Sequence, residues 1–337
     1  MIIPVNLKEN SYEIRVERGI LGKAGEYLNL NRRVLIVTDT GVPKAYAERV
    51  AAKCKTPVVI TVEEGEDSKS LATYELLLKV MLENHFTRKD CVVAVGGGVV
   101  GDLSGFVAAS YMRGVDFYNI PTTLLSQIDS SIGGKTAVNF CGIKNIVGAF
   151  HQPRAVLIDP DVLSTLPDRQ IANGLAEAIK MALTFNESLF RLFEEKDPLE
   201  NIDTVITESL KIKRDVVEQD EKEAGLRKVL NFGHTVGHGI ESEEALHGLY
   251  HGECVALGML PMCAEPVRER LLTVLAKVGL PTEADFDKDK AFEAMLHDKK
   301  FAAETVTVIT VDTVGSFRMR EVDRDTLYRM LASLNKN

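Results

Sequence analysis

In the first half of the chain, short runs rich in β-branched residues alternate with stretches of helical periodicity. The predicted strands are Tyr12–Val16, Val34–Thr38, Val58–Val62, Val92–Val95, Phe117–Ile120 and Ala155–Ile158. The predicted helices between them are Pro43–Cys54, Ser70–Asn84 and Gly101–Met112. Strands that alternate with helices are typical of a parallel sheet wound with crossover helices. The sequence therefore predicts an α/β N-terminal half.

From about Leu163 onward, apolar residues recur every three to four positions, which is the helical period. The predicted helices are Arg169–Leu183, Leu199–Asp220, His234–Glu244, Gly252–Val267 and Leu271–Val278, and a hairpin of Thr305–Thr310 with Ser316–Arg320 precedes a final helix, Asp323–Leu334. We expect an α/β domain over residues 1–160 and a mostly α-helical domain over residues 161–337. A cleft between two such domains is a usual place for a cofactor and its substrate.

Composition and charge indicate which classes of protein and of binding partner to expect. A length of 337 residues suits two domains, and a mean hydropathy of -0.01 is typical of a soluble globular chain. The net charge of -9 repels nucleic acid and anionic lipid, so we expect neither as a partner. The five cysteines form no CxxC pair, and the N-terminus lacks the pattern of a signal peptide. The expected location is the cytoplasm.

A glycine-rich segment follows one of the predicted strands. Residues 96–102 read GGGVVGD after the apolar run CVVAV, and Gly96, Gly98 and Gly101 satisfy the pattern G-x-G-x-x-G. Such a turn lets the backbone approach a pyrophosphate at a helix N-terminus. Glycine-rich turns also form for packing alone, and the motif by itself does not separate the two interpretations.

Several polar residues near other strand ends could contact a nucleotide. Asp39 ends the strand VLIVTD and could meet a ribose, whereas Glu66 and Lys69 lie in the loop EEGEDSKS. Thr122 and Thr123, in PTTLL, place two hydroxyls after a strand. A solvated charged loop and a hydroxyl-capped turn are the alternative interpretations of these segments.

Histidines cluster in one short stretch. Four of the seven are His234, His238, His247 and His251, and His234 and His238 are spaced to share one helix face. Glu177 lies in the helical stretch GLAEAIK. Two or three imidazoles with one carboxylate are the usual ligands of catalytic zinc, so we favour a metal site over isolated structural histidines. The spacing leaves open whether His238 or His251 is the third ligand.

A set of cations and amides recurs beside these motifs. Any single lysine is more often a solvated surface charge, but Lys180 follows Glu177 by three residues, on the same helix face, and Arg227 and Asn231 lead into His234. Cations near a metal site in an acidic chain indicate a substrate with several negative charges, such as a phosphate and a carboxylate. The full set is Lys135, Lys144, Asn145, Lys180, Lys213, Arg227, Asn231, Lys299 and Lys300.

Taken in order, these motifs resemble the 3-dehydroquinate synthase family of sugar phosphate cyclases. The strings are GGGVVGD, RGV…IPTTLLSQIDSSIGGKTAVN, GLAEAIK, GLRKVLNFGHTVGHGIE and HGECVALGM, and the resemblance runs from about Val34 to the DKK near residue 300. It implies a Rossmann-like N-terminal domain, a helical C-terminal domain and a homodimer. It also implies NAD and one divalent metal, zinc or cobalt, as cofactors. One departure is FCGIKN at Phe140–Asn145, where the family often has HPLGKN.

The resemblance also assigns roles to residues. It implies Glu177, His234 and His251 as metal ligands, which leaves His238 for the substrate, and it implies that Arg113 reaches the site of the partner subunit. The implied substrate set is Asp129, Lys135, Asn145, Lys180, Lys213, Arg227, Asn231, His238 and one lysine of the DKK motif, for which we take Lys299. The implied nucleotide set is Asp39, Glu66, Lys69, Gly97, Gly98, Val99, Asp102, Thr122, Thr123, Lys144 and Thr165.

The implied reaction converts 3-deoxy-D-arabino-heptulosonate 7-phosphate to 3-dehydroquinate and phosphate, in the shikimate route to aromatic amino acids. NAD is reduced and then reoxidised within each cycle, phosphate leaves by β-elimination, and an aldol step closes the ring. A paralogous cyclase acting on another sugar phosphate is one alternative. Lys213 and Arg227, the carboxylate partners by resemblance, argue against it. A metal-dependent polyol dehydrogenase of related fold is a second alternative, and it has little use for so many substrate cations. A non-catalytic dinucleotide-binding sensor is a third, and it would not need three metal ligands.

Overall fold

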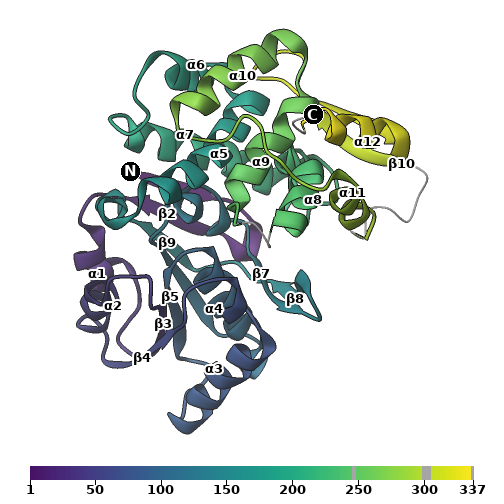
Figure 1. The fold of residues 1–337 in the computed structure, drawn as a ribbon. Helices are drawn as coiled ribbons and strands as arrows, with labels where there is room; N and C mark the ends of the chain where they lie inside the picture. The colour runs from purple at the N-terminus through teal and green to yellow at the C-terminus, as the bar shows by residue number, and fades with distance from the viewer. Residues whose placement is uncertain (245–247, 298–304, 335–337) are drawn as a thin grey trace. The chain divides into compact units, whose positions relative to one another are not determined.

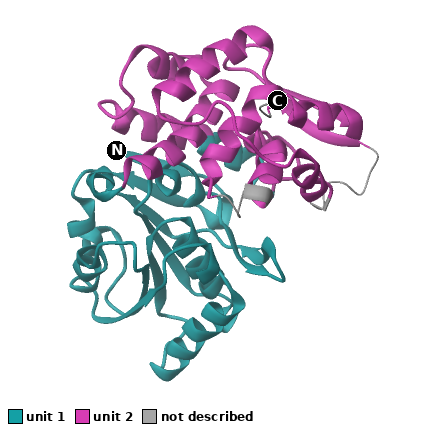
Figure 2. Ribbon diagram, in the orientation of Figure 1, with its two compact units in different colours: residues 1–166, 213–222 teal, residues 167–212, 223–337 magenta. Residues whose placement is uncertain are grey.

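A computed structural model describes residues 1–244, 248–297 and 305–334 (Figure 1). The chain forms two compact units, shown in different colours in Figure 2. Unit 1 comprises Met1–Leu166 and Lys213–Lys222, and unit 2 comprises Pro167–Ile212 and Glu223–Asn337. Among the described helices, none combines the length and apolar character that a membrane span requires.

Unit 1 is built on a seven-stranded sheet in the order β1-β2-β9-β6-β5-β3-β4. The strands are β1 (Ile2–Val5), β2 (Tyr12–Val16), β3 (Arg33–Asp39), β4 (Thr56–Val62), β5 (Cys91–Gly96), β6 (Asp116–Pro121) and β9 (Ala155–Ile158). Neighbouring strands are parallel except for the pair β1 and β2. The predicted parallel α/β architecture is confirmed, and the antiparallel edge strand β1 was not predicted.

The alternation of side chains along the inner strand β3 shows how helices cover both faces of the sheet in unit 1. Val34 and Ile36 join the apolar cluster that contains residues of α2 (Lys44–Ala51), whereas Leu35 and Val37 join the cluster that contains residues of α3 (Leu71–Glu83) and α4 (Gly98–Ser110). Successive strand residues point to opposite faces, so a strand covered on both faces must be apolar throughout. The remaining short helices are η1 (Lys8–Asn10), η2 (Ile20–Lys23), α1 (Ala24–Tyr27), η3 (Glu66–Ser68), η4 (Tyr111–Arg113), η5 (Ser126–Ser130) and η6 (Pro160–Thr165).

A hairpin in unit 1 was also not predicted from the sequence. It consists of β7 (Lys135–Phe140) and β8 (Ile143–Phe150), paired antiparallel. Its two-residue turn, Cys141–Gly142, has φ of 50° and 78°, the left-handed region that such turns require at both positions. Phe140 and Ile143 are exposed, so this end of the hairpin lacks the apolar alternation that would have revealed a strand.

Unit 2 is mostly helical, as predicted. Its helices are α5 (Asp168–Phe185), α6 (Glu187–Glu195), the first part of α7 (Ile202–Gln219), η7 (Leu226–Asn231), α8 (His234–Glu244), α9 (His251–Met259), η8 (Leu260–Met262), α10 (Glu265–Lys277), α11 (Lys288–His297) and α12 (Arg324–Ala332). Strands β10 (Thr305–Thr310) and β11 (Arg318–Asp323) form the predicted hairpin. The single predicted helix Gly252–Val267 is wrong: α9 ends before Pro261, which begins a separate turn, and α10 starts at Glu265.

Helices α8 and α9 cross with their backbones in contact. A Cβ atom added to Gly258 would lie 2.1 Å from the carbonyl oxygen of Gly233, and one added to Gly237 would lie 2.9 Å from that of Cys254. Only residues without a side chain permit this approach. The close crossing fixes the spacing of the two helices, whose first residues, His234 and His251, are predicted metal ligands with ring centroids 5.2 Å apart.

Candidate metal centre and nucleotide loop

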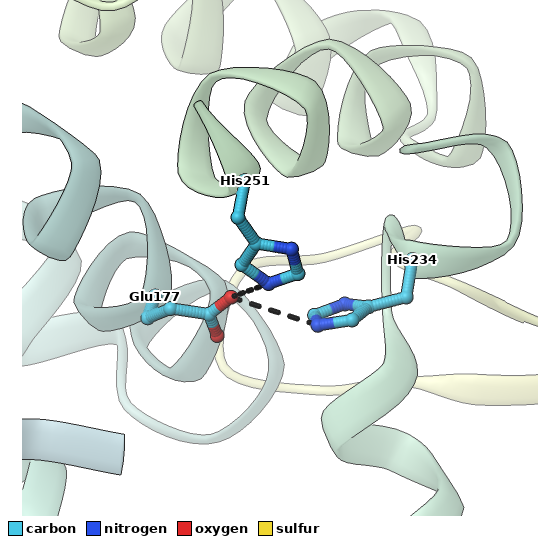
Figure 3. A group of neighbouring side chains, drawn as sticks. All are labelled: Glu177, His234 and His251. Carbon is cyan, nitrogen blue, oxygen red and sulfur yellow. Dashed lines mark ion pairs between the residues drawn. The ribbon is translucent and has the colours of Figure 1, made fainter. Parts of the chain in front are cut away.

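Three helices of unit 2 each contribute one side chain to a compact group of ligand atoms (Figure 3). Glu177 projects from the middle of α5, and His234 and His251 are the first residues of α8 and α9. The Oε1 atom of Glu177 lies 3.6 Å from Nε2 of His234 and 3.4 Å from Nε2 of His251. All three ligand atoms lie within 4.8 Å of one another.

The geometry and the burial of this group fit a divalent cation. Tetrahedral zinc with bonds of about 2.0–2.2 Å holds its ligand atoms about 3.3–3.6 Å apart, close to the two separations found here. Glu177 is 1% exposed. Its Oε2 pairs with the Lys180 ammonium, whereas its Oε1, which faces the two imidazoles, has no hydrogen-bond partner among the described residues. A cation bound beside Oε1 would satisfy this buried oxygen.

A stripe of residues on α5 holds the start of α9 in place. Arg169, Asn173 and Glu177 are spaced four apart and so share one face of the helix. Arg169 donates to both carboxylate oxygens of Glu253 at 2.7 Å, and Asn173 Oδ1 accepts from the Gly252 amide at 2.6 Å. These contacts flank His251 in the first turn of α9. Sequence reasoning missed them, although the spacing of four from Glu177 was available.

The surroundings shift the pKa values of the three ligands in different directions. Burial alone would raise the pKa of Glu177, but Lys180 and His251 outweigh it and hold that pKa well below its usual range. Burial, together with Lys180 and the neighbouring imidazoles, lowers the pKa of His234, which keeps the imidazole neutral as metal binding requires. Burial would also lower the pKa of His251, but Glu177 and Glu241 outweigh it and raise the pKa to about 10.

Other predicted residues of unit 2 lie around this centre. The Lys180 ammonium forms an ion pair with Oε2 of Glu177, and the lysine side chain is 2% exposed. The His238 ring centroid lies 5.2 Å from that of His234 and 5.8 Å from that of His251. Arg227, in η7, is buried at 2% exposure, and Asn231 donates to Glu223 at 2.7 Å. Lys299, Lys300 and His247 lie outside the described residues.

Predicted substrate residues of unit 1 lie at three places. Lys213, which is 5% exposed, forms an ion pair with Asp129 and also donates to its backbone carbonyl. Lys135 begins β7 with an exposed side chain, and Asn145 lies on β8. Arg113 is exposed at the end of η4, where Met112 and Arg113 have φ of 49° and 68°. The structure thus pairs Lys213 with Asp129, two residues that sequence analysis treated separately.

The predicted nucleotide residues partly converge. Gly97 and Gly98 begin α4, whose N-terminus has no side-chain cap, and Thr122 donates its amide to the Gly96 carbonyl at 3.0 Å, which joins the ends of β5 and β6. Lys69 donates to Asp102 at 2.6 Å and to Asn145. Uncapped amides at a helix N-terminus bind phosphate readily.

The remaining nucleotide predictions make local contacts. Asp39 accepts from the amides of Gly41 and Val42 at 2.9 and 3.0 Å, and Thr165 shares a hydrogen bond with the Tyr46 hydroxyl at 3.1 Å. Glu66 accepts from Asn139 at 2.8 Å. Thr123, after β6, accepts from the Ser126 amide at 3.2 Å, while Val99 lies in the first turn of α4 and Lys144 on β8. These positions stay predictions.

Comparison with known proteins identifies the family. Residues 59–173 match the family model described as 3-dehydroquinate synthase N-terminal, and residues 174–301 match the one described as 3-dehydroquinate synthase C-terminal. The chain belongs to the 3-dehydroquinate synthase family. It is 42% identical to the 3-dehydroquinate synthase of Enterococcus faecalis (95% of each chain covered) and 39% identical to that of Streptococcus pneumoniae (97% of this chain, 98% of the relative).

Solved structures of sugar phosphate cyclases share the fold of this 3-dehydroquinate synthase family member. A 2-deoxy-scyllo-inosose synthase complexed with carbaglucose-6-phosphate, NAD+ and Co2+ matches with a TM-score of 0.88 at 25% identity, covering 99% of this chain and all of that one. The 2-epi-5-epi-valiolone synthase of Streptomyces hygroscopicus, with NAD+ and Zn2+ bound, matches with a TM-score of 0.88 at 29% identity over 98% of each chain. A probable glycerol dehydrogenase from Sinorhizobium meliloti shares the fold alone, with a TM-score of 0.64 at 18% identity.

Proposed function

We propose that this protein converts 3-deoxy-D-arabino-heptulosonate 7-phosphate to 3-dehydroquinate and phosphate, a carbon–oxygen lyase reaction. The observation that carries the proposal is the group of Glu177, His234 and His251 in unit 2, together with the buried cations Lys180 and Arg227, in a chain whose family is 3-dehydroquinate synthase. Polyol dehydrogenation needs no buried arginine, whereas an acidic substrate does.

The proposed cofactors are NAD and one divalent metal, zinc or cobalt, as in the two cyclase structures. When bound, the metal lowers the pKa of a coordinated hydroxyl and NAD accepts and returns a hydride. Glu177, His234 and His251 would hold the metal. The uncapped N-terminus of α4, with Lys69 and Asp102 beside it, supports a pyrophosphate and ribose site for NAD in unit 1.

The remaining residues of the proposed substrate set act by charge and by orientation. We assign Lys180 and Lys135 to the phosphate, whose departure needs its developing charge held in place, and Arg227 and Lys213 to the carboxylate. The amides of Asn145 and Asn231 and the imidazole of His238 would fix the hydroxyl groups. Asp129 would orient Lys213, with which it is paired. Lys299 completes the set as a prediction. Binding both ends of the substrate restricts its conformation for each step.

We further propose a homodimer in which Arg113 reaches the partner's site, and a cytoplasmic location. Arg113 is exposed in unit 1, and the free cysteines at Cys54, Cys91, Cys141, Cys254 and Cys263 suit a reducing compartment. Subunit mixing tests the first proposal. If Arg113 acts across the dimer, inactive R113A and inactive K180M chains should recover activity when mixed, because one site of each mixed dimer is intact. Continued inactivity of verified mixed dimers would assign Arg113 to its own chain.

The decisive assay measures phosphate release from the heptulosonate phosphate with and without a chelator. We expect release that requires metal and NAD, with no accumulation of NADH, because the hydride returns in each cycle. Phosphate-independent growth of NADH absorbance with glycerol would favour a dehydrogenase. Cyclisation of glucose 6-phosphate or sedoheptulose 7-phosphate, with no turnover of the heptulosonate, would favour a paralogous cyclase.

A further inference from the structure

The imidazole of His251 lies between two carboxylates from different helices. Its Nε2 atom is 3.4 Å from Oε1 of Glu177 on α5, and its Nδ1 atom is 3.0 Å from Oε2 of Glu241 on α8. The two ring nitrogens therefore face different partners. The first carboxylate belongs to the candidate metal centre, and sequence analysis gave the second no role.

His234 shows the same division of its ring. Its Nδ1 atom lies 3.1 Å from the carbonyl oxygen of Phe232, and its Nε2 atom faces Glu177. A carbonyl oxygen can only accept, so the neutral imidazole carries its hydrogen on Nδ1 and offers the Nε2 lone pair. Both histidines thus turn Nε2 toward the same carboxylate oxygen. In each ring the other nitrogen, Nδ1, faces an acceptor oxygen, which belongs to Glu241 for His251 and to the Phe232 carbonyl for His234.

A second group of potential ligands shares His251 and must be weighed against the first. His238, Glu241 and His251 also place ligand atoms within 4.8 Å of one another. The Glu241 side chain is 16% exposed, whereas that of Glu177 is 1% exposed. The Glu177 Oε2 pairs with Lys180, but the Oε1 that faces both imidazoles has no hydrogen-bond partner among the described residues. The greater need for a cation is therefore at Glu177. A cation there takes Nε2 of His251 and leaves Nδ1–H directed at Glu241.

We propose that Glu241 is a positioning residue of the metal centre, which accepts the Nδ1–H hydrogen bond of His251 and thereby fixes the tautomer and ring orientation that present Nε2 to the metal. The inference rests on the metal site of the proposed function and not on the identity of the substrate. Outer partners of this kind orient metal-bound histidines and raise their basicity, and losing one costs about 10–100-fold in metal affinity or activity.

The test measures metal binding in the full-length protein without substrate. Zinc affinity is determined by competition with a chromophoric chelator, and Co2+ absorption reports the ligand geometry. E241A and E241M both remove the acceptor, the second with nearly the original side-chain length. We expect each to weaken zinc about 10–100-fold and to change the Co2+ spectrum. E241Q keeps an acceptor oxygen and should stay within a few-fold of the parent protein.

A matched control is E194A. Glu194 on α6 accepts from Arg270 at 2.7 and 2.9 Å and is 24% exposed, so its removal breaks a comparable carboxylate contact elsewhere in unit 2. Its zinc affinity should be unchanged. Parent-like zinc affinity and Co2+ spectra in E241A and E241M would overturn the proposal, as would E241Q binding as weakly as E241A.

Two further outcomes separate the alternatives. If E177A retains zinc while E241A abolishes it, the group of His238, Glu241 and His251 is the metal site and Glu241 is a direct ligand, contrary to the proposal. We expect E177A to lose more affinity than E241A. Intact metal binding in the parent protein without phosphate release from the heptulosonate phosphate would count against the proposed function and leave this inference standing.

Discussion

Lys180 and Glu177 form an ion pair in which both side chains are almost fully buried, at 2% and 1% exposure. Removing one partner of such a pair leaves an uncompensated charge inside the protein. In this molecule the Glu177 carboxylate also faces two imidazoles, so a metal ion bound there would itself compensate the negative charge of Glu177. Lys180 therefore contributes most to stability when the metal is absent.

The substitution K180M tests this role. In chelator we expect the free energy of unfolding to fall by about 3–5 kcal/mol, because Glu177 loses its buried partner, and with saturating zinc we expect a smaller loss. Denaturant unfolding under both conditions measures the difference. K211M is the control, since Lys211 pairs with Glu208 at the same spacing of three but with 42% and 32% exposure, and it should lose at most about 1 kcal/mol. Equal losses for the two variants in chelator would contradict the argument.

His151, which is not part of the metal centre, should make the stability of the fold depend on pH. Burial lowers its pKa, and its Nε2 lies 3.0 Å from the Val115 carbonyl. The unfolded chain, with a histidine pKa of about 6.5, then binds more protons than the folded one as pH falls below that value. The stability contributed by neutral His151 is full above pH 6.5 and is lost as pH falls toward the folded-state pKa. In H151Q, the free energy of unfolding should decline less between pH 7 and pH 5. Parallel profiles would contradict the assignment.

At the scale of elements, the crossing of α8 and α9 depends on glycines. In G258A the added Cβ would lie 2.1 Å from the Gly233 carbonyl oxygen and 2.7 Å from the Gly237 amide nitrogen, so the helices must separate. We expect loss of several kcal/mol in stability, as for severe overpacking (about 1–3 kcal/mol or more), and weaker zinc binding because His234 and His251 move apart. G22A, where nothing lies within 4 Å of the added atom, should leave both unchanged in thermal melts and chelator competition.

The elements that sequence analysis found and missed differ in burial. Val34–Thr38 and Val92–Val95 were predicted because strands covered on both faces are continuous apolar runs. The β7–β8 hairpin was missed because its turn end is exposed. The break between α9 and α10 was missed because apolar spacing continues through Pro261, which should have ended the helix.

The candidate site was predictable only in part. Grouped histidines indicated a metal, but the spacing left His238 and His251 as alternatives, and only the family resemblance separated them. Glu241 contacts His251, and Asn173 and Arg169 contact the next two residues of α9, Gly252 and Glu253. These contacts depend on how three helices pack, which local sequence patterns do not encode. The glycines at the α8–α9 crossing were visible in the sequence, and their spacing is the signal that could have indicated a close helix contact.

At the scale of the whole molecule, the two cofactors are assigned to different units. The metal ligands all belong to unit 2, and the glycine loop at α4 belongs to unit 1. Ligands stabilise the structure to which they bind. Hydrogen exchange should therefore slow in the first turns of α8 and α9 and around Glu177 on addition of zinc, and at the start of α4 on addition of NAD. Zinc protection confined to unit 1 would contradict the assignment.

Unit 1 is discontinuous in sequence, since Lys213–Lys222 belongs to it although 46 residues of unit 2, Pro167–Ile212, come first. The ribosome synthesises the chain from its N-terminus. All strands of the sheet are therefore made before Lys213, which pairs with Asp129 only after residues 167–212 have also been synthesised. Truncation after residue 166 would yield a fragment with the whole seven-stranded sheet but without Lys213, which pairs with Asp129. No single cut therefore separates the two units, because one after residue 222 would divide unit 2 between Pro167–Ile212 and Glu223–Asn337.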